Sequence, residues 1–363
     1  MRIGRKPSDE ADAVGAGAFA DGESSGRRDP ILWLVACGIL LIAAIAVGTA
    51  MTVFNFRDHA LESSKRELEN TVILLARHFD QQLNDAEVPL VDLIEQIHQA
   101  GIDSPEDFKR RMSTPEMQRE LAENVSRASK VAGLNIYDAD GLLINSSETT
   151  TVPGVRIDDR AYFKALKSSA DVAQPQIELV LSRFTGVWKI LLTRKVAAPD
   201  GTFLGVVSRA IAPAKFEAFF STVALGKEAT ISMHHRDGTL LARYPHADEF
   251  MGKDFKAGST PEAAALLGLG HGTARLFSPV DGADRLVAIQ SLSRFPLSVV
   301  ATTTVASSLA DWRAQTRFLV VAAILSAIVV AITIVLIVRR LTWQHQSAQR
   351  RVRLEKQRLD TAV

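Results

Sequence analysis

The sequence has a single cysteine, Cys37, among its 363 residues. One thiol cannot form an intrachain disulfide or supply a cysteine cluster for a metal, so the chain must be stabilised by its own apolar core. Net charge is nearly absent as well, at +1 with the histidines neutral. The composition therefore gives no reason to expect nucleic acid as a partner.

The signatures of common enzymes are also missing. The sequence contains no G-x-S-x-G and no H-E-x-x-H, which argues against a hydrolase. His234 and His235 would point to opposite faces of a strand, and Asp237 belongs to a predicted turn, so these residues do not make a metal site. The glycine-rich stretch 268–272 follows a helix and precedes a strand, the reverse of a dinucleotide-binding loop. We expect no catalytic, cofactor or metal site in this chain.

Two long uncharged runs are present instead, at residues 31–54 and 318–338. Each is long enough to cross the ~30 Å hydrocarbon core of a membrane as a helix. The first run follows a polar stretch and is longer than the apolar part of a secretory signal peptide, so we interpret it as an uncleaved anchor. Two membrane helices would then enclose one large segment.

The charge distribution predicts the orientation of these spans. Residues 339–363 carry seven basic and two acidic side chains, whereas residues 1–30 carry five basic and six acidic ones. Because basic residues beside a span are retained in the cytoplasm, both termini are expected to be cytoplasmic and the large segment external. Residues 1–30 show no apolar periodicity and are rich in Gly, Ala, Ser and Asp, which is typical of a disordered tail.

The residues that follow the first run predict a long helix over residues 55–100. Apolar positions recur there at intervals of three, four and seven, which indicates a helix with one apolar stripe. The stripe consists of Leu61, Leu68, Val72, Leu75, Phe79, Leu83, Ala86 and Leu90. Pro89 is expected to kink this helix or to start a new one. The stripe could join two subunits of a dimer or pack on its own domain, and both interpretations stay open.

Turn signals between apolar runs predict β-hairpins in the rest of the outer segment. The turns are Asp140-Gly141, Pro199-Asp200-Gly201, Asp237-Gly238 and Asp281-Gly282. Short helices are expected between the hairpins, at about residues 159–167 and 260–267. The segment thus contains two copies of strand, turn, strand, helix, strand, turn, strand. This order predicts an α+β fold, with two antiparallel sheets that each have helices on one side.

Four stretches carry a family resemblance: residues 159–163 (DRAYF), 186–195 (GVWKILLTRK), 200–207 (DGTFLGVV) and 236–245 (RDGTLLARYP). Together with the long helix that leaves the membrane, they resemble the double Cache, or tandem PAS-like, sensor domains of bacterial transmembrane receptors. The similarity is to the subtype found with diguanylate cyclases and sensor histidine kinases.

The resemblance implies a membrane-distal lobe at residues 101–220 and a membrane-proximal lobe at residues 221–315, both built on the long helix. It also implies a homodimeric, two-pass protein of the bacterial inner membrane whose outer domain is periplasmic or extracellular. Residues 339–363 fall near a heptad spacing and resemble the lead-in to a PAS domain. They would form a cytoplasmic signalling helix that leads to an output module of cyclic-di-GMP or two-component signalling, in this chain or in a partner.

The resemblance further implies that a small ligand binds in the distal lobe. Arg160 and Tyr162 match the charged and aromatic pair at the rim of the family's pocket, and Trp188 and Arg194 match strand positions that line the sheet. The spacing independently places Trp188 and Arg194 on one face of a strand. Because a guanidinium binds a carboxylate through two hydrogen bonds and an aromatic ring covers apolar parts, a small organic acid or amino acid is the expected ligand.

Less specific interpretations apply to the same residues. Asp158 and Asp159 are expected to cap the helix that follows them, and Arg160 could pair with one of them. Trp188 could be an ordinary core residue. For the outer segment as a whole, the alternative function is a structural or protein-interaction module of the cell envelope that binds no small ligand.

Overall fold

A computed structural model describes residues 30–127, 132–148, 154–171, 174–183, 185–223, 225–226, 228–257 and 260–360. The expected disordered tail at residues 1–30 lies outside the described residues, except for Pro30. The chain divides into two compact units, one formed by Met1–Val53 with Gln315–Val363 and the other by Phe54–Ala314. We call Phe54–Ala314 the outer unit.

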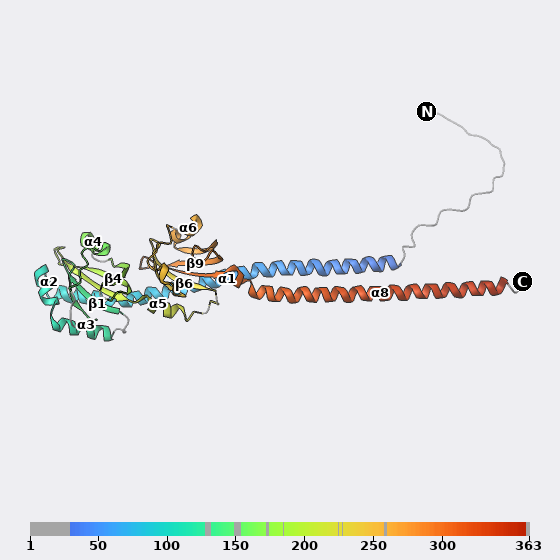
Figure 1. Cartoon of the computed structure of the whole chain (residues 1–363), viewed down its shortest axis with the longest axis horizontal. Helices are drawn as coiled ribbons and strands as arrows, with labels where there is room; N and C mark the ends of the chain where they lie inside the picture. Colours follow the sequence, from blue (N-terminus) through green and yellow to red (C-terminus); the bar gives the residue numbers. More distant parts are fainter. Residues whose placement is uncertain are drawn as a thin grey trace, which may run out of the picture. The chain divides into compact units, whose positions relative to one another are not determined.

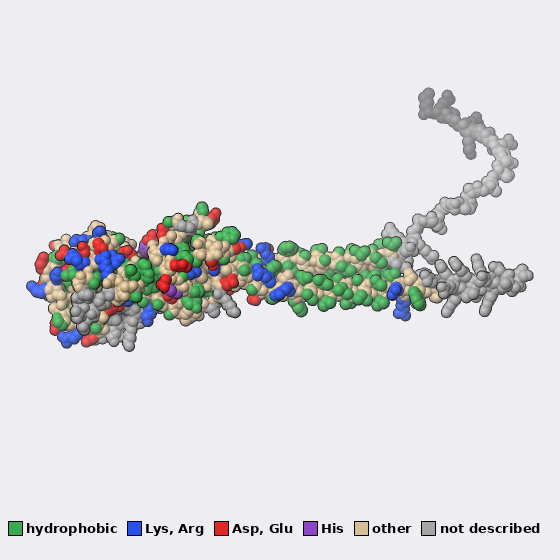
Figure 2. Space-filling view, viewed as in Figure 1, with side chains coloured by type: hydrophobic (Ala, Val, Ile, Leu, Met, Phe, Trp, Pro, Cys, Tyr) green, Lys and Arg blue, Asp and Glu red, His purple; other side chains and the backbone are tan. Residues whose placement is uncertain are grey.

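Two helices are long and apolar enough to cross a membrane. They are α1 (Pro30–Gln99), with the candidate span at its start, and α8 (Ala310–Asp360), whose candidate segment is Ala310–Gln344. Their apolar side chains, such as Leu40 and Leu336, are exposed, and Figure 2 shows this apolar surface along both helices. This pattern suits lipid contact and is consistent with a two-pass membrane protein.

The long helix α1 continues from the first apolar run into the outer unit without interruption. No new helix starts at Pro89, because α1 passes through this residue to Gln99. The apolar stripe is buried in the same chain, with Leu68, Val72 and Phe79 at most 2% exposed. The stripe therefore packs on its own domain, and its interpretation as a seam between two subunits is wrong for these buried positions.

The distal lobe is a five-stranded antiparallel sheet with strand order β2-β1-β5-β4-β3. Its strands are β1 (Ala132–Asp138), β2 (Leu143–Ser146), β3 (Gln176–Leu181), β4 (Trp188–Ala197) and β5 (Phe203–Ile211). The helices are α2 (Pro105–Met112), α3 (Pro115–Arg127) and α4 (Ala161–Ser168) (Figure 1). Ser104 caps α2 by accepting a hydrogen bond from the amide of Asp107, as expected for serine before a proline at the first helical position.

The proximal lobe repeats this plan with strand order β7-β6-β10-β9-β8. Its strands are β6 (Thr230–His235), β7 (Leu240–Tyr244), β8 (His271–Phe277), β9 (Asp284–Ser291) and β10 (Leu297–Thr304). The helices are α5 (Pro213–Phe220), the 3₁₀ turn η1 (Asp248–Phe250), α6 (Pro261–Leu269) and α7 (Val305–Ser308). The predicted α+β fold, with two PAS-like lobes on a long N-terminal helix, is therefore confirmed.

Each sheet has two covered faces, and this arrangement decides where a ligand can bind. One face of each sheet joins α1 in a shared core that contains Phe79, Ile190 and Val299. The opposite face of the distal sheet packs on α4 through Tyr137 and Phe163. The opposite face of the proximal sheet forms a separate small core with α6. Hollows are found on the α4 and α6 faces, away from the α1 core.

The sequence pattern missed one strand in each lobe. Four strands were expected per lobe, and each lobe has five, because β3 belongs to the distal sheet and a further strand separates β8 from β10 in the proximal one. The turn at Asp281-Gly282 joins β8 to β9, whereas β9 and β10 are joined by a short loop that contains Arg294 and Phe295. Edge strand β3 lacks the continuous apolar signal of a central strand, which is why it was difficult to recognise. In the proximal lobe, the stretch after the Asp281-Gly282 turn was expected as one strand and forms both β9 and β10.

Candidate functional site

A hollow of about 610 Å³, including its open mouth, lies in the distal lobe between the sheet and α4. We call it the distal hollow. Its walls come from all five strands of the sheet and from the segment before α4. Polar and charged members of the lining are Asn135, Ser146, Glu148, Arg160, Ser182, Arg183 and Lys189. Apolar members include Leu143, Val155, Ile157, Val180, Leu191 and Ala210.

A row of polar side chains crosses the sheet on the side of this hollow. Strand register aligns Ser146, Asn135, Ser208, Thr193 and Gln176 across all five strands. The Ser146 hydroxyl donates to the Asn135 side-chain oxygen at 2.7 Å, and the Thr193 hydroxyl donates to the Gln176 carbonyl at 3.2 Å. Of this row, Asn135 and Ser146 line the hollow and give it hydrogen-bonding groups beside its apolar walls, a combination that is typical of small-molecule sites.

Two of the predicted site residues meet at the distal hollow. Arg160 lies immediately before α4, and its Nη2 donates to the Leu181 carbonyl on the neighbouring strand end at 3.0 Å. Tyr162 lies on α4 and is 5% exposed. Burial, and then the neighbouring Tyr137, raise the pKa of Tyr162 above its usual range, and burial raises the pKa of Tyr137 to about 12. Both phenols therefore stay neutral at physiological pH.

The aspartates before α4 form ion pairs instead of capping the helix. The residue at the cap position is Arg160, which makes no side-chain capping bond. Asp159 binds the Arg183 guanidinium through two hydrogen bonds, and this contact lowers the pKa of Asp159 to about 2. Asp158 pairs with Arg156 at 3.1 Å. The capping expected of these two aspartates is thus wrong, because nearby guanidinium groups compete for their carboxylates.

Opposite charges face each other in the distal hollow. Lys189 Nζ lies 3.7 Å from Glu148 Oε1, and the two side chains are 17% and 30% exposed. This separation is at the long end of an ion pair, so either group can take a further partner without a tight contact being broken. The hollow consequently offers a cationic side, formed by Lys189 and Arg160, and an anionic side, formed by Glu148.

The other two predicted site residues lie on the opposite face of the sheet. Trp188 packs against the core on the α1 side, and Arg194 forms an ion pair with Glu87 of α1. Neither lines the distal hollow. The prediction that Trp188 and Arg194 line the ligand pocket is therefore wrong for this hollow. The two residues do share a face of β4, as the spacing indicated, but that face packs on α1. Lys189, one residue from Trp188, faces the hollow.

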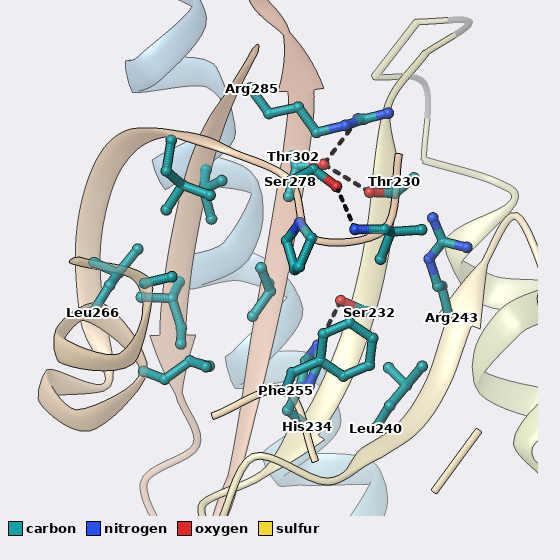
Figure 3. A pocket seen from close by; sticks show the side chains of 18 residues that line it. Thr230, Ser232, His234, Leu240, Arg243, Phe255, Leu266, Ser278, Arg285 and Thr302 are labelled. Carbon is teal, nitrogen blue, oxygen red and sulfur yellow. Dashed lines mark hydrogen bonds between the residues drawn. The ribbon is translucent and has the colours of Figure 1, made fainter. Parts of the chain in front are cut away.

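The proximal lobe contains a second hollow, of about 790 Å³ with its mouth, between the sheet and α6. We call it the proximal hollow. Figure 3 shows Arg285, Thr302, Ser278 and Thr230 gathered at one end and Leu266 and Phe255 away from them. No predicted site residue lies there. The sequence carried only one indirect signal for it, the alternation of β6 and β7 around the Asp237-Gly238 turn.

Comparisons with known proteins agree with this architecture. Residues 213–302 match the family model dCache_1_like, a histidine kinase sensor domain. The extracellular domain of rpHK1S-Z16, assigned as a histidine kinase, is 28% identical, with 69% of this chain and 99% of that chain covered and a TM-score of 0.56. A comparison with curated proteins finds no match by sequence.

Two chemoreceptor domains share the fold at lower identity. The periplasmic sensory domain of the Campylobacter jejuni chemoreceptor Tlp1 is 12% identical and covers 69% of this chain and 98% of its own, with a TM-score of 0.55. The ligand-binding domain of the Pseudomonas fluorescens chemoreceptor CtaA, solved with L-isoleucine, is 15% identical. The match covers 71% of this chain and 99% of the CtaA domain, with a TM-score of 0.51. The outer unit is therefore similar in fold to the extracellular sensor domains of histidine kinases and chemoreceptors, and its residues 213–302 match a dCache_1-like sensor domain, in agreement with the resemblance stated from the sequence.

Proposed function

We propose that this chain is a transmembrane receptor whose distal hollow binds a small amino acid or organic acid outside the cytoplasm. The observation that carries the proposal is the pairing of a cationic and an anionic side over an apolar floor in that hollow. An amino acid offers a carboxylate to Lys189 and Arg160 and an ammonium group to Glu148. Charge-assisted hydrogen bonds of this kind are the strong ones in recognition sites.

The covalent path to the membrane supports the signalling part of the proposal. Helix α1 is continuous from the distal core to the first apolar run, and β10 continues through α7 into α8. A ligand that binds one arrangement of the distal lobe more tightly than another shifts the equilibrium between the two arrangements. Such a shift acts on both apolar helices through these connections, and from them on a cytoplasmic output module of two-component or cyclic-di-GMP signalling.

We further propose that the receptor acts as a homodimer in the inner membrane with both termini cytoplasmic. The charge distribution around the apolar runs supports the orientation. The buried stripe of α1 is not available for dimerisation, but Leu74, Val88 and Val91 on the same helix are exposed at 65%, 46% and 41%. An apolar set of this kind on a long helix is a surface that a second subunit can cover.

A thermal-shift screen of the full chain in lipid nanodiscs tests the proposal. Amino acids and organic acids are the probes, and a ligand at 100 times its Kd should add about 2.7 kcal/mol to the free energy of unfolding. Arg160→Gln should abolish the shift. Lys164→Gln, a charge loss at an exposed position of the same helix α4, is the matched control and should keep it.

Two results would count against the proposal. A complete absence of shifts for a folded protein favours the structural or protein-interaction module over the receptor. Equal ligand affinity in Arg160→Gln and Lys164→Gln would show that a ligand binds, but outside the distal hollow.

A further inference from the structure

The proximal hollow lies on a sheet that changes from polar to apolar across its width. One row of paired residues runs Arg243, Ser232, Val300, Ile289 and Gly272, from edge strand β7 to edge strand β8. All of these except Gly272 line the hollow. The parallel row runs Thr230, Thr302, Val287 and Ala274 in the same direction. A bound molecule would therefore meet hydrogen-bonding groups at one end and hydrocarbon at the other.

The apolar end is closed by helix α6 and the strands beneath it. Leu266 on α6 is 8% exposed and packs with Val287, Ile289 and Val300 of the sheet. Leu276 and Leu267 complete this side of the lining. No charged side chain of the described part lines the hollow at this end, so it can hold a hydrocarbon group such as a branched chain or a ring.

At the polar end, Arg285 is already fully engaged. Its Nε and Nη2 donate to Asp281 Oδ2 at 3.2 and 2.6 Å, respectively. Its Nη1 donates to the Glu228 carbonyl at 2.9 Å and to the Thr302 hydroxyl at 3.1 Å. The Arg285 contact holds the pKa of Asp281 far below its usual range. This pair is a neutral, fixed wall of the hollow.

The second guanidinium at this end, that of Arg243, is not neutralised in this way. Within the described residues no ion pair and no side-chain hydrogen bond of Arg243 is found, and its guanidinium carbon lies 5.9 Å from the centre of the Phe250 ring. Burial, followed by the positive charge of Arg285, lowers the pKa of Arg243. Asp281 and Glu249 act in the opposite direction on this pKa. Arg243 is thus a half-buried cation, and an anion placed against it would offset the burial of its charge.

The remaining polar group of the hollow, His234, is neutral and internally satisfied. Its Nδ1–H donates to the Gly238 carbonyl at 3.4 Å, and its Nε2 accepts from the Ser232 hydroxyl at 3.0 Å. Burial lowers the pKa of His234 to about 4. Its ring packs edge-on against Phe255, with centroids 5.4 Å apart. His234 therefore supplies aromatic surface and no charge.

We propose that the proximal hollow is a second ligand site, which binds a small monocarboxylate with an apolar body. Its carboxylate binds the Arg243 guanidinium in the fork geometry typical of arginine and carboxylate. The hydroxyls of Thr230 and Thr302 lie at the same end, and the apolar body fills the space between α6 and the sheet. A dicarboxylate is disfavoured, because its second charge would be buried at the apolar end without a partner.

Titration of the full chain in nanodiscs with 4-methylpentanoate and phenylacetate tests this assignment. The corresponding amides, 4-methylpentanamide and phenylacetamide, have the same shape without the charge and should bind at least about tenfold more weakly. Arg243→Gln should weaken carboxylate binding by a similar factor and remove the preference over the amide. Arg236→Gln, an exposed arginine at the β6–β7 turn, is the matched control and should change neither.

Two further variants keep the test decisive. Ala263→Phe places a ring in the lining of the hollow from α6 and should block both acid and amide while the protein remains folded by circular dichroism. Arg160→Gln, in the distal hollow, should leave monocarboxylate binding intact. The proposal is overturned if neither acid binds at millimolar concentration, if acid and amide bind equally, or if Arg160→Gln abolishes binding while Arg243→Gln preserves it.

Discussion

Glu87 of α1 forms an ion pair with Arg194 of β4 although its side chain is only 1% exposed. Its second oxygen, Oε2, lies 2.9 Å from Nη2 of Arg294, which belongs to the loop between β9 and β10. Two further residues of the same helix accept hydrogen bonds from Arg294. Its Nη1 donates to Asn84 Oδ1 at 2.5 Å, and its backbone amide donates to Asp80 Oδ1 at 3.2 Å. One carboxylate of α1 thus contacts an arginine from each lobe of the outer unit, and this contact ties both lobes to the helix that begins with a candidate membrane span.

Glu87→Gln should destabilise the outer unit. Removal of one partner from a buried ion pair leaves the other charge without compensation, which costs roughly 3 kcal/mol or more. Urea unfolding followed by circular dichroism measures the loss. Glu62→Gln, which breaks an exposed pair with Arg66 on the same helix, is the control and should change the free energy of unfolding by less than about 1 kcal/mol. Equal effects of the two variants would show that Glu87 is not a structural tie.

Neighbouring residues of β4 should separate ligand binding from stability, because they face opposite sides of the sheet. Lys189→Gln should weaken binding of a distal ligand about tenfold with little change in the thermal unfolding temperature. Trp188→Leu should lower the free energy of unfolding by about 1–3 kcal/mol and leave ligand affinity unchanged. Calorimetric titration together with thermal unfolding makes the distinction. A loss of affinity confined to Trp188→Leu would place the site on the α1 face instead.

Gly205→Ala should be strongly destabilising for a steric reason. A β-carbon at Gly205 would lie 2.1 Å from the backbone oxygen of Tyr137 on the paired strand, and backbone atoms cannot move away as a flexible side chain can. We expect a loss of about 1–3 kcal/mol or more. Gly154→Ala, where nothing lies within 4 Å of the new atom, is the control and should be close to neutral. Similar stabilities for the two variants would contradict the register of β1 and β5.

The neutral, buried His234 predicts a dependence of stability on pH. Burial lowers the pKa of His234 from 6.5, its ordinary value, to about 4 in the folded protein, so between these values the unfolded chain takes up a proton that the folded chain does not. The free energy of unfolding should therefore fall as the pH drops from about 6.5 towards 4, by up to about 1.4 kcal/mol per pH unit. His234→Gln should flatten this slope, whereas His235→Gln should not. An unchanged slope in His234→Gln would assign the acid sensitivity to other groups.

The fold could be predicted from the sequence to the extent that local patterns decide it. The periodicity of α1 and the Asp-Gly turns indicated the long helix and the hairpins, because a helix stripe and a tight turn are determined by nearby residues. Edge strand β3 was missed, and the stretch after the Asp281-Gly282 turn was expected as one strand although it forms both β9 and β10. The alternative of a new helix start at Pro89 was wrong, because α1 continues through it with buried neighbours such as Leu83 and Leu90.

The candidate site was predicted less well, for a reason that lies in the sheet itself. Both faces of β4 are covered, so the strand shows no simple alternation of polar and apolar residues that would tell which face binds a ligand. Arg160 and Tyr162, which the resemblance assigned to a pocket, line the distal hollow, whereas Arg194 does not line it and pairs with Glu87. Glu148 and Lys189 were not considered, because their approach depends on tertiary structure alone.

Hydrogen–deuterium exchange of the full chain in nanodiscs tests the central claim most directly, since it locates a ligand without any variant. The probe is the amino or organic acid with the largest thermal shift. Binding in the distal hollow predicts slower exchange in α4, β3 and β4, with α6 unchanged. Slower exchange confined to the proximal lobe, or no change at a saturating concentration, would contradict the assignment of the distal hollow as the receptor's primary site.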